Sequence, residues 1–583
     1  MMSQASSIRE KIIEGLAKVA PLEPEDIDEL LEVPPDPEMG DYALPCFTLA
    51  SEMRKSPVDI AAELAEGFEV PENVSEVRGA GPYLNFSVDR GAMARQVLDS
   101  IRESRGAYGG SDIGNGKTVV IDYSSPNIAK HLGVHHLRSA IIGRALYRIF
   151  GALGYDCVGI NHLGDWGTSF GKLIVACERY PELDPDTATV SDLQEAYVRF
   201  SREARDNPDL GDEAREAFRR LEEGDPEARR LWKRFKKVSL AEFERIYDML
   251  GIEFDHYTPE SFYLDRTQEL LERLQQHGIA EESEGALVVD LEEHDLPPMM
   301  LRKQDETTLY ATRDLCAAEY RREEYDFEWC FYVVGGEQKL HFDQLKTVLE
   351  LMGHDWADHI EHVDFGLLKF IDEETGQARK GSTRSGQMIL LEDVLENGIQ
   401  KAREKIRDNV DKLEAGADLD ELAAQVGIGA VVFSDLCVNR SRDVIFDWDR
   451  MLDFEGDTGP YVQYAHARLC SILRKAGEDV DPGADCDRLE LPEEWELIRK
   501  LEAYPGRVKA AARRRQPSVI ANYLLELCSE FSSYYSAGMR EPDRRVLCPD
   551  AQTRAARLLL VDAVRHVIHD GLQLLGVAAP ERM

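Results

Sequence analysis

The sequence predicts an α/β protein with a small α+β domain, a central domain built on a parallel sheet, and a helical region at the end. Three observations support this prediction. A strand pair is expected before residue 90, short apolar strands alternate with helices from about residue 117, and helical periodicity continues from about residue 391. The chain of 583 residues is long enough for about three or four domains.

The first segment, residues 1–110, opens with a predicted helix whose apolar side chains share one face: Ile8, Ile12, Leu16 and Val19. Pro and Gly in the stretch PPDPEMGDYALPCF interrupt that pattern. A strand pair follows between Val77 and Val88, with turn residues at Gly79, Gly81 and Pro82. Taken by itself, this segment is a small α+β domain with no chemistry of its own.

The central domain, expected over residues 111–390, begins with the apolar strand KTVVIDYSS at Lys117. Pro126 and Asn127 turn the chain, and a helix follows whose apolar face is made by Leu137, Ile141, Leu146 and Ile149. Residues 156–162 are the next expected strand. A strand, a turn and a helix in this order open nucleotide-binding α/β domains.

A charged, helical stretch at 190–250 interrupts this domain, so we expect a mainly helical insertion over about residues 172–290. The sheet is expected to resume near Leu287, with its clearest strand in FYVVGG at 331–336. Residues 391–583 are predicted to form an all-α bundle, with helices over 423–440, 458–475, 495–515, 517–535 and 551–575.

Charge and cysteine usage narrow the class of protein. The 110 acidic and 69 basic residues give a formal net charge of −41, which disfavours non-specific nucleic-acid binding but is compatible with a local basic path. The ten cysteines contain no C-x-x-C pair, so we expect reduced thiols and no zinc. We see no secretory signal and no apolar run long enough to span a membrane, so a cytoplasmic location is expected.

Residues 125–136, SPNIAKHLGVHH, gather three histidines, Lys130 and Gly133 where a strand ends and a helix begins. The free N–H groups at the start of a helix favour an anion, and imidazole and ammonium donors strengthen that preference. The segment therefore predicts a phosphate site, with ATP as the natural ligand. The alternative is that the histidines only cap the helix, because short motifs often match by chance.

Longer stretches stand in a fixed order: SSPNIAK…HLRSAIIG, NHLGDWGTSFG, YATRDL, YVVGGEQKLHF and DTGPYVQYAHARL, with PEMGDYALPCF…GAGPYLNF near the start and GVAAPERM at the end. Together they resemble the arginyl-tRNA synthetases, which are class I aminoacyl-tRNA synthetases, over essentially the whole chain. The resemblance implies a Rossmann-type catalytic domain, an N-terminal tRNA-binding domain (1–110) and a helical anticodon-binding domain (391–583). It also implies an enzyme that activates arginine with ATP and transfers it to the terminal adenosine of arginine tRNA.

The first ATP motif of that class usually reads His-Val-Gly-His in the arginine family, and it aligns here with Gly133 to His136. The final histidine is kept, but the first has become Gly133 and the usual glycine has become His135. Our hypothesis is that His135 or His131 supplies the lost imidazole from another direction. By resemblance, the ATP-binding residues are Pro126, Asn127, His131, Gly133, Val134, His135, His136, Thr383 and Arg384.

The second ATP motif of the class corresponds to GSTRS at 381–385, with Lys380 before it. By composition alone this stretch is a solvated Gly/Ser loop. Members of the arginine family often lack the usual lysine there, and a lysine before the first motif, here Lys130, is thought to substitute. The resemblance thus implies Lys130, His136 and Arg384 as catalytic residues that stabilise charge on the phosphates, with ATP bound as its Mg²⁺ complex.

Arginine recognition requires carboxylates and neutral acceptors, because a guanidinium presents a planar set of donors and keeps its charge. By resemblance, the arginine-binding residues are Asp122, Asn127, Tyr310, Asp314 and Gln338. Asp122 stands where Glu is more usual, and Asn127 is expected to hold the α-amino end. The alternative for Asp314 is a surface carboxylate paired with Arg313.

Transfer-RNA contacts are expected from Tyr461, Tyr464, His466 and Arg468, and from Arg513 and Arg514 in the basic run 509–515. The alternatives are core aromatic residues and a solvated helix face. The family usually needs bound tRNA before it activates arginine, and a monomer is expected. Competing interpretations are another class I synthetase, such as the cysteine enzyme, a catalytically silent tRNA-binding relative, and a helical scaffold.

Overall fold

The computed structural model describes residues 7–34, 36, 39–104, 106–304, 308–371, 378–380, 388–407 and 418–583. The chain divides into two compact units. One contains Met1–Gly109, Ala465–Gly506 and Glu526–Asp570, and the other contains Gly110–Tyr464, Arg507–Leu525 and Gly571–Met583. Each unit therefore joins segments that are far apart in the sequence.

The unit that holds the N-terminus contains a three-stranded antiparallel sheet in the order β1-β3-β2. The strand pair expected between Val77 and Val88 is confirmed as β2 and β3, whose turn contains Gly81 at a φ of +58°. This part consists of α1 (Ile8–Leu16), α2 (Pro24–Leu30), β1 (Tyr42–Pro45), α3 (Ala50–Met53), α4 (Pro57–Gly67), β2 (Val74–Ala80), β3 (Tyr83–Val88) and α5 (Arg90–Ser104).

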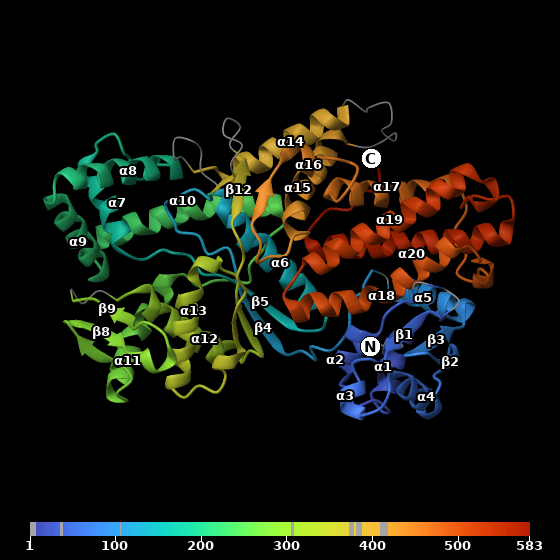
Figure 1. The fold of residues 1–583 in the computed structure, drawn as a ribbon. Helices are drawn as coiled ribbons and strands as arrows, with labels where there is room; N and C mark the ends of the chain where they lie inside the picture. The colour runs from blue at the N-terminus through green and yellow to red at the C-terminus, as the bar shows by residue number, and fades with distance from the viewer. Residues whose placement is uncertain are drawn as a thin grey trace. The chain divides into compact units, whose positions relative to one another are not determined.

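The second unit is built on a five-stranded parallel sheet in the order β11-β10-β4-β5-β6. The strands are β4 (Thr118–Asp122), β5 (Asp156–Asn161), β6 (His256–Tyr257), β10 (Trp329–Tyr332) and β11 (Ile360–His362). Helix α6 (Leu137–Ala152) lies on one face of the sheet, and α12 (Tyr310–Tyr325) and α13 (Lys339–Leu351) lie on the other (Figure 1). The strands predicted from Lys117 and at 156–162, and the helix between them, are confirmed.

The expectation that this sheet resumes near Leu287 is wrong. Strands β7 (Glu281–Ser283), β8 (Ala286–Val289) and β9 (Met299–Arg302) form a separate antiparallel sheet, and the parallel sheet resumes only at β10. Leu287 and Val289 are buried in a core that also contains residues of α11 (Leu264–Gln276) and α12. An apolar strand shows that it is buried but not which sheet it joins, because both kinds of strand have the same side-chain period.

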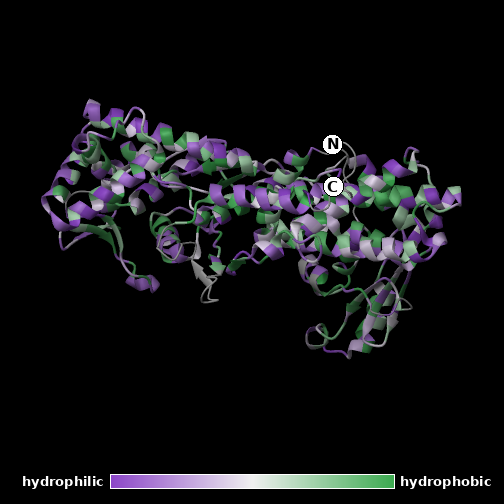
Figure 2. Ribbon diagram, turned by 90° about the horizontal axis from the view of Figure 1, so that it is seen from above, coloured by the Kyte–Doolittle hydropathy of each residue, from purple (hydrophilic) through white to green (hydrophobic). Residues whose placement is uncertain are grey.

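Four helices lie between β5 and β6, in the first part of the range predicted for the insertion: α7 (Thr168–Arg179), α8 (Val190–Asp206), α9 (Asp209–Glu222) and α10 (Pro226–Leu250). Hydrophilic and hydrophobic residues alternate along their lengths, as expected for helices with one packed face (Figure 2). The longest, α10, begins at Asp225, whose Oδ1 accepts a hydrogen bond from the Ala228 amide at 2.9 Å, and it ends at Gly251 at a φ of +61°.

A small sheet in the order β13-β12-β14 follows the parallel sheet in sequence. Its strands are β12 (Leu368–Ile371), β13 (Ala378–Lys380) and β14 (Val444–Phe446), and β14 was not predicted. Between β13 and β14 lie α14 (Leu391–Arg407) and α15 (Leu419–Leu436), and α16 (Trp448–Met451) follows. Helices α14 and α15 approach so closely at Gly398 and Gly427 that a Cβ at Gly427 would lie 2.6 Å from the Gly398 backbone.

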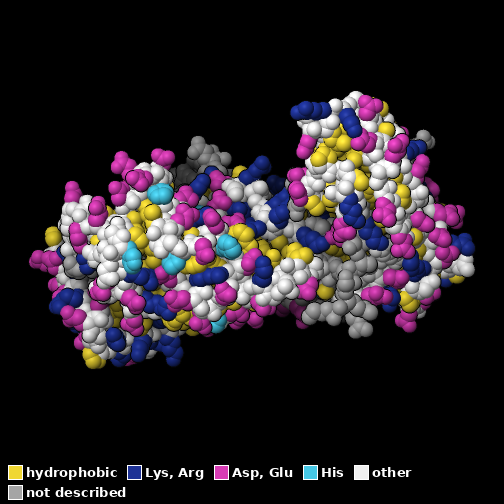
Figure 3. All heavy atoms as spheres, turned by 90° about the horizontal axis from the view of Figure 1, so that it is seen from below, with side chains coloured by type: hydrophobic (Ala, Val, Ile, Leu, Met, Phe, Trp, Pro, Cys, Tyr) yellow, Lys and Arg dark blue, Asp and Glu magenta, His cyan; other side chains and the backbone are white. Residues whose placement is uncertain are grey.

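The helices predicted for the last part of the chain are confirmed, with ends shifted by a few residues. The first of the five is α15, and the others are α17 (Gly459–Ala476), α18 (Pro492–Arg514), α19 (Ser518–Arg540) and α20 (Ala551–Leu575). Acidic side chains spread over the face seen in Figure 3, with lysines and arginines between them.

Within the described residues, we find no helix that is long and apolar enough to cross a membrane. The ten cysteines are all described, and none of them forms a disulfide bond.

A buried ion pair joins α6 to α15 within the second unit. The Arg138 and Asp435 side chains are 1% and 2% exposed, and Arg138 Nε lies 2.9 Å from Asp435 Oδ2. Arg138 also donates to the carbonyl oxygens of Gly366 and Arg442. We predict that Arg138→Ala lowers the free energy of unfolding by about 3–5 kcal/mol, because it leaves a buried carboxylate without its partner.

Urea-induced unfolding measures this loss. Arg144→Ala, a change of a more accessible arginine on the same helix, is the matched control, with an expected loss of about 1 kcal/mol or less. Equal losses in the free energy of unfolding for the two variants would contradict the stabilising role of the Arg138–Asp435 ion pair.

Candidate active site

The site lies at the carboxyl ends of β4 and β10. These two strands are neighbours, with Asp122 opposite Tyr332, but the chain continues from β4 to β5 on one side and from β10 to β11 on the other. In open parallel sheets, ligands bind in the crevice at such a switch point. The sheet topology therefore defines the place where the predicted residues after each strand should meet.

The turn after β4 has an unusual backbone. Ser124 and Ser125 both adopt positive φ values, +71° and +47°, although neither is glycine. Ser125 Oγ donates to Asp122 Oδ1 at 2.6 Å and accepts from the His162 amide at 3.2 Å, and these bonds hold the turn between β4 and β5. Such strained residues persist only where surrounding contacts fix them, and they cluster at functional sites.

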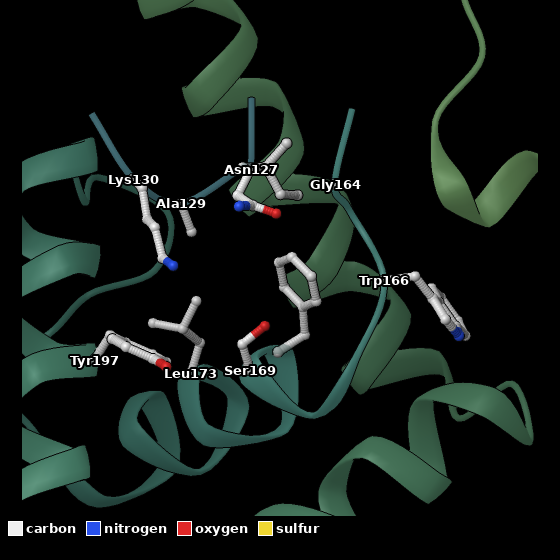
Figure 4. Close-up of a pocket in the computed structure, with 10 residues that line it drawn as sticks. Asn127, Ala129, Lys130, Gly164, Trp166, Ser169, Leu173 and Tyr197 are labelled. Carbon is white, nitrogen blue, oxygen red and sulfur yellow. The ribbon is translucent and has the colours of Figure 1, made fainter. Parts of the chain in front are cut away.

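Asn127 follows this turn and lies against Gly164. A Cβ at Gly164 would lie 2.1 Å from Asn127 Oδ1, so a larger residue at 164 would displace the asparagine. Asn127 and Lys130 line a small pocket in which the Lys130 amine, the Asn127 amide and the Ser169 hydroxyl point inward (Figure 4). The remaining lining residues are Ile128, Ala129, Gly164, Trp166, Phe170, Leu173 and Tyr197.

The segment predicted to be the first ATP motif contains a short 3₁₀ turn, η2 (Val134–His136), that leads into α6. The His136 Nδ1 atom lies 3.1 Å from both the amide nitrogen and the carbonyl oxygen of Gly133, so that backbone holds the ring in either neutral tautomer. Burial, followed by the charges of His135 and Lys130, lowers the pKa of His136 to about 3. The imidazole is therefore neutral near pH 7, and it can contact a phosphate as a hydrogen-bond donor but not as a cation.

This pKa shift gives a prediction about acid stability. The unfolded chain binds a proton at His136 below about pH 6.5, whereas the folded chain does so only near pH 3, so stability falls as the pH drops through that window. We predict that His136→Gln loses about 3 kcal/mol less stability than the native chain between pH 7 and pH 4. Urea titrations at both pH values measure this, and parallel losses in the two proteins would contradict it.

His135 fills the space beside Gly133. A Cβ at Gly133 would lie 2.6 Å from the His135 ring and 2.5 Å from Met388 Sδ, so a larger residue at position 133 would displace these side chains. The His135 ring also contacts the His136 ring, with 4.0 Å between centroids. Of the two proposed substitutes for the lost imidazole, His135 therefore lies within the motif, whereas both ring nitrogens of His131 bond to Glu242 and Ser191 of the insertion.

The segment that follows the second ATP motif lies beside the first one. The Val134 amide donates to the Ile389 carbonyl and the Leu391 amide donates to the Leu132 carbonyl, each at 2.9 Å. Thr383 and Arg384 lie outside the described residues. The chain is described again from Met388, so the segment that lies beside Leu132 and Val134 is residues 389–391.

The two acids predicted for arginine binding have different surroundings. Asp122 is 3% exposed, and its Oδ2 accepts a hydrogen bond at 2.6 Å from Arg321, an arginine on α12 that is fully buried. Asp314, also on α12, bonds to His341 Nε2 at 2.8 Å and lies 3.7 Å from His162 Nε2. Burial raises the pKa of Asp314, but the hydrogen bond and charge of His341 and the charges of His162 and Arg321 outweigh it and hold the pKa below its usual value.

Sequence analysis missed the partners of these acids. Arg321 lies seven residues after Asp314, about two helical turns further along the same helix, but no local pattern indicated that it would pair with Asp122. His162 directly follows β5, and His341 is in the stretch YVVGGEQKLHF. Tyr310 is 54% exposed with its ring 5.0 Å from the His341 ring, and Gln338 is exposed at the end of η5 (Gly336–Gln338).

The residues predicted to contact tRNA differ in how far their side chains are exposed to solvent. His466 is 1% exposed, with its ring 5.8 Å from the His569 ring, and Arg468 lies over Tyr535. Tyr461 is partly buried and Tyr464 is 37% exposed. Arg513 and Arg514 are exposed, so these two arginines and Tyr464 offer more surface to an RNA than His466 does.

Zinc and other metal ions are held in proteins by groups of His, Cys, Asp and Glu side chains. Within the described part of the chain, no three His, Cys, Asp or Glu side chains come together in a way that could hold a metal ion. The absence of zinc stays a prediction.

A parallel sheet interrupted by helices, with a candidate site at its switch point, is the architecture of a class I aminoacyl-tRNA synthetase, and three family models match this chain. Residues 98–448 match "tRNA synthetases class I (R), catalytic domain", residues 462–583 match "DALR anticodon binding domain", and residues 6–88 match "Arginyl tRNA synthetase N terminal domain". This chain belongs to the arginyl-tRNA synthetase family, whose members are arginine–tRNA ligases.

Relatives match along the whole chain. The arginine–tRNA ligase of Clostridioides difficile is 44% identical over 567 residues, which are 97% of this chain and 98% of that protein. The arginine–tRNA ligase of Clostridium perfringens is 46% identical over 575 residues, 98% and 99% of the two chains. The arginyl-tRNA synthetase structure from Thermus thermophilus is 27% identical, with a TM-score of 0.82 over 98% of this chain and 99% of that one.

Proposed function

We propose that this chain joins arginine to arginine tRNA in two steps, with ATP–Mg²⁺ as co-substrate. In the first step, an oxygen of the arginine carboxylate attacks the α-phosphorus of ATP, and pyrophosphate leaves. In the second, the 2′-hydroxyl of the terminal adenosine of the tRNA attacks the adenylate carbonyl, and AMP leaves. The observation that carries the proposal is the neighbouring position of Asn127, Lys130 and the first ATP motif at the switch point of the sheet.

Arginine is held by two ends in this proposal. Asn127 binds the α-amino end, and the Asp314 carboxylate, ionised at neutral pH, faces the guanidinium. Asp122 adds negative charge from its buried pair with Arg321. Tyr310 and Gln338 provide neutral donors and acceptors from exposed positions, and no nucleophile of the protein is needed.

The phosphates of ATP are bound by the two motifs. Lys130 neutralises charge that develops on the pyrophosphate, and Thr383 and Arg384 of the second motif bind the phosphates as well. His136, as a neutral imidazole, donates a hydrogen bond to a phosphate. Pro126, Gly133 and Val134 contact ATP through their backbone. His135 supplies the imidazole that the usual motif carries at position 133, and His131, which was predicted to bind ATP, instead holds the chain before the motif through its contacts with α8 and α10.

Transfer RNA is bound by both ends of the chain. We propose an N-terminal tRNA-binding domain over residues 1–110, a catalytic domain over 111–390 with its insertion at about 172–290, and an anticodon-binding domain over 391–583. Tyr461, Tyr464, His466, Arg468, Arg513 and Arg514 are the proposed contacts of the last domain. The protein acts as a monomer in the cytoplasm.

An aminoacylation assay tests this function. Purified protein is incubated with labelled arginine, ATP, Mg²⁺ and either arginine tRNA or a tRNA for another amino acid. We expect acid-precipitable label only with arginine tRNA. Charging of the tRNA with labelled lysine or labelled cysteine in place of arginine would contradict the proposal. A protein that binds the tRNA but incorporates no label would also contradict it and would favour a catalytically silent tRNA-binding relative.

The exchanged residues of the first motif give a separate prediction. Gly133→His restores the usual residue at that position but forces its side chain into the His135 ring and Met388, so we predict a loss of about tenfold or more in kcat/KM for ATP. The double variant Gly133→His with His135→Gly should recover to within about threefold of the native value. ATP–pyrophosphate exchange rates measure both, and a double variant no better than the single one would refute the coupling.

A further inference from the structure

Three consecutive residues at the entrance to the first ATP motif are each held by the helical insertion. The Ala129 amide donates to Ser239 Oγ at 2.8 Å, and Ser239 is fully buried on α10, where its hydroxyl donates to the Phe235 carbonyl. The position of this backbone is therefore set by a helix that lies more than 100 residues further along the chain.

His131 makes the densest set of these contacts. Its Nδ1 lies 2.8 Å from Glu242 Oε1 on α10, its Nε2 lies 3.0 Å from Ser191 Oγ on α8, and its amide donates to Gln194 Oε1 on α8 at 3.2 Å. A carboxylate can only accept, so Nδ1 carries the proton and the serine hydroxyl donates to Nε2. The ring of His131 is thus held by both α8 and α10, and its backbone amide is held by α8.

Lys130 lies between these two anchored residues. Its Nζ is 5.6 Å from the centre of the Tyr197 ring on α8, and Figure 4 shows that amine directed into the pocket above the ring. Tyr197 lines the same pocket as Lys130 and Asn127. The lysine therefore has its backbone fixed on both sides and its charged end placed against the same insertion.

We infer that helices α8 and α10 position Lys130 for the reaction through an insertion clamp made of Ser191, Gln194, Ser239 and Glu242. Members of the clamp contact the chain at Ala129 and His131 and are themselves positioning residues, as is His131. The inference rests on the proposed role of Lys130 at the phosphates. Rate depends steeply on the placement of a charged group in the transition state, so a small shift of the lysine lowers kcat.

A simpler role for these contacts is to attach the insertion to the catalytic domain. In that case, loosening the clamp would change stability and activity without regard to the side chain at position 130. If the clamp acts by placing the lysine, its loss matters only while the lysine is present. The two roles therefore differ in how a clamp variant combines with Lys130→Ala.

The test is a double-mutant cycle measured by arginine-dependent ATP–pyrophosphate exchange on the full-length protein with arginine tRNA present. We expect His131→Ala to lower kcat by about 10- to 50-fold while KM for arginine changes by less than about threefold. In the Lys130→Ala background, the same change should cost less than about twofold. An equal fold loss in both backgrounds would overturn the inference, and so would native exchange by His131→Ala.

A second variant keeps the test informative if His131→Ala folds poorly. Glu242→Gln keeps the size of the clamp side chain and removes its charge, and we expect a smaller loss of about 3- to 10-fold that again disappears without Lys130. Glu203→Gln, which changes an exposed ion pair with Arg199 on α8, is the matched control and should leave exchange unchanged. Native exchange by Lys130→Ala itself would instead remove the proposed role of that lysine, and the inference with it.

Discussion

Replacing Asp314 with Asn is expected to raise KM for arginine by about 10²- to 10³-fold, with a smaller change in KM for ATP. The side chain keeps its size but loses the charge that faces the guanidinium. Removing one partner of a buried, hydrogen-bonded charge pair leaves the other charge without compensation, and the cost of that is large. Initial rates of pyrophosphate exchange over a range of arginine concentrations measure the effect.

The control for this variant lies on the same helix. Glu323→Gln changes an acid of α12 that pairs with Arg266 at the surface, and it should alter KM for arginine by less than about twofold. Both variants lower the net negative charge equally, so a general electrostatic effect would affect both. A similar KM increase in the two variants would exclude a specific role for Asp314.

Replacing Lys130 with Ala is expected to lower kcat for arginine activation by about 10²- to 10³-fold, while KM for arginine stays within about threefold. The lysine is assigned to charge that grows on the leaving pyrophosphate, so its loss should appear in the chemical step. Lys130→Arg, which keeps the charge on a different shape, should recover part of the rate.

Lys172 is the matched control for Lys130. Its amine lies 5.3 Å from the centre of the same Tyr197 ring, but it is directed to Ser201 Oγ at 3.4 Å and does not line the pocket. Lys172→Ala should therefore lower kcat by less than about fivefold. Equal losses for the two lysines would show that the pocket needs positive charge in general and not Lys130 in particular.

Local sequence patterns predicted the order of elements well. The strand at Lys117, the turn at Asn127 and the helix after it were all readable, because buried strands and one-sided helices have different apolar periods. The long C-terminal helices were predicted for the same reason. Prediction was poorer for short strands such as β14, where three residues carry no period at all.

Pairings between distant residues could not be predicted in this way. His131 looked like a phosphate ligand because it lies in the first ATP motif, but its ring is bound by Ser191 and Glu242 on the insertion. Arg321 had no sign in its own neighbourhood that it would pair with Asp122, which is 199 residues away. Such contacts arise from the packing of helices on the sheet, and no local periodicity encodes them.

The helical region shows the same limit. His466 and Tyr464 are two residues apart on α17, yet the first is buried and the second is exposed. The direction of a side chain around a helix follows from which face packs, and an aromatic residue is compatible with either face.

The central claim is that this chain activates arginine with a first ATP motif in which glycine and histidine have changed places. Arginine-dependent ATP–pyrophosphate exchange, measured with and without arginine tRNA across a salt series, tests it most directly. We predict exchange that requires arginine, that is stimulated by the tRNA and that is lost in Lys130→Ala. No exchange at any salt concentration, in a protein that still binds the tRNA tightly, would contradict the claim.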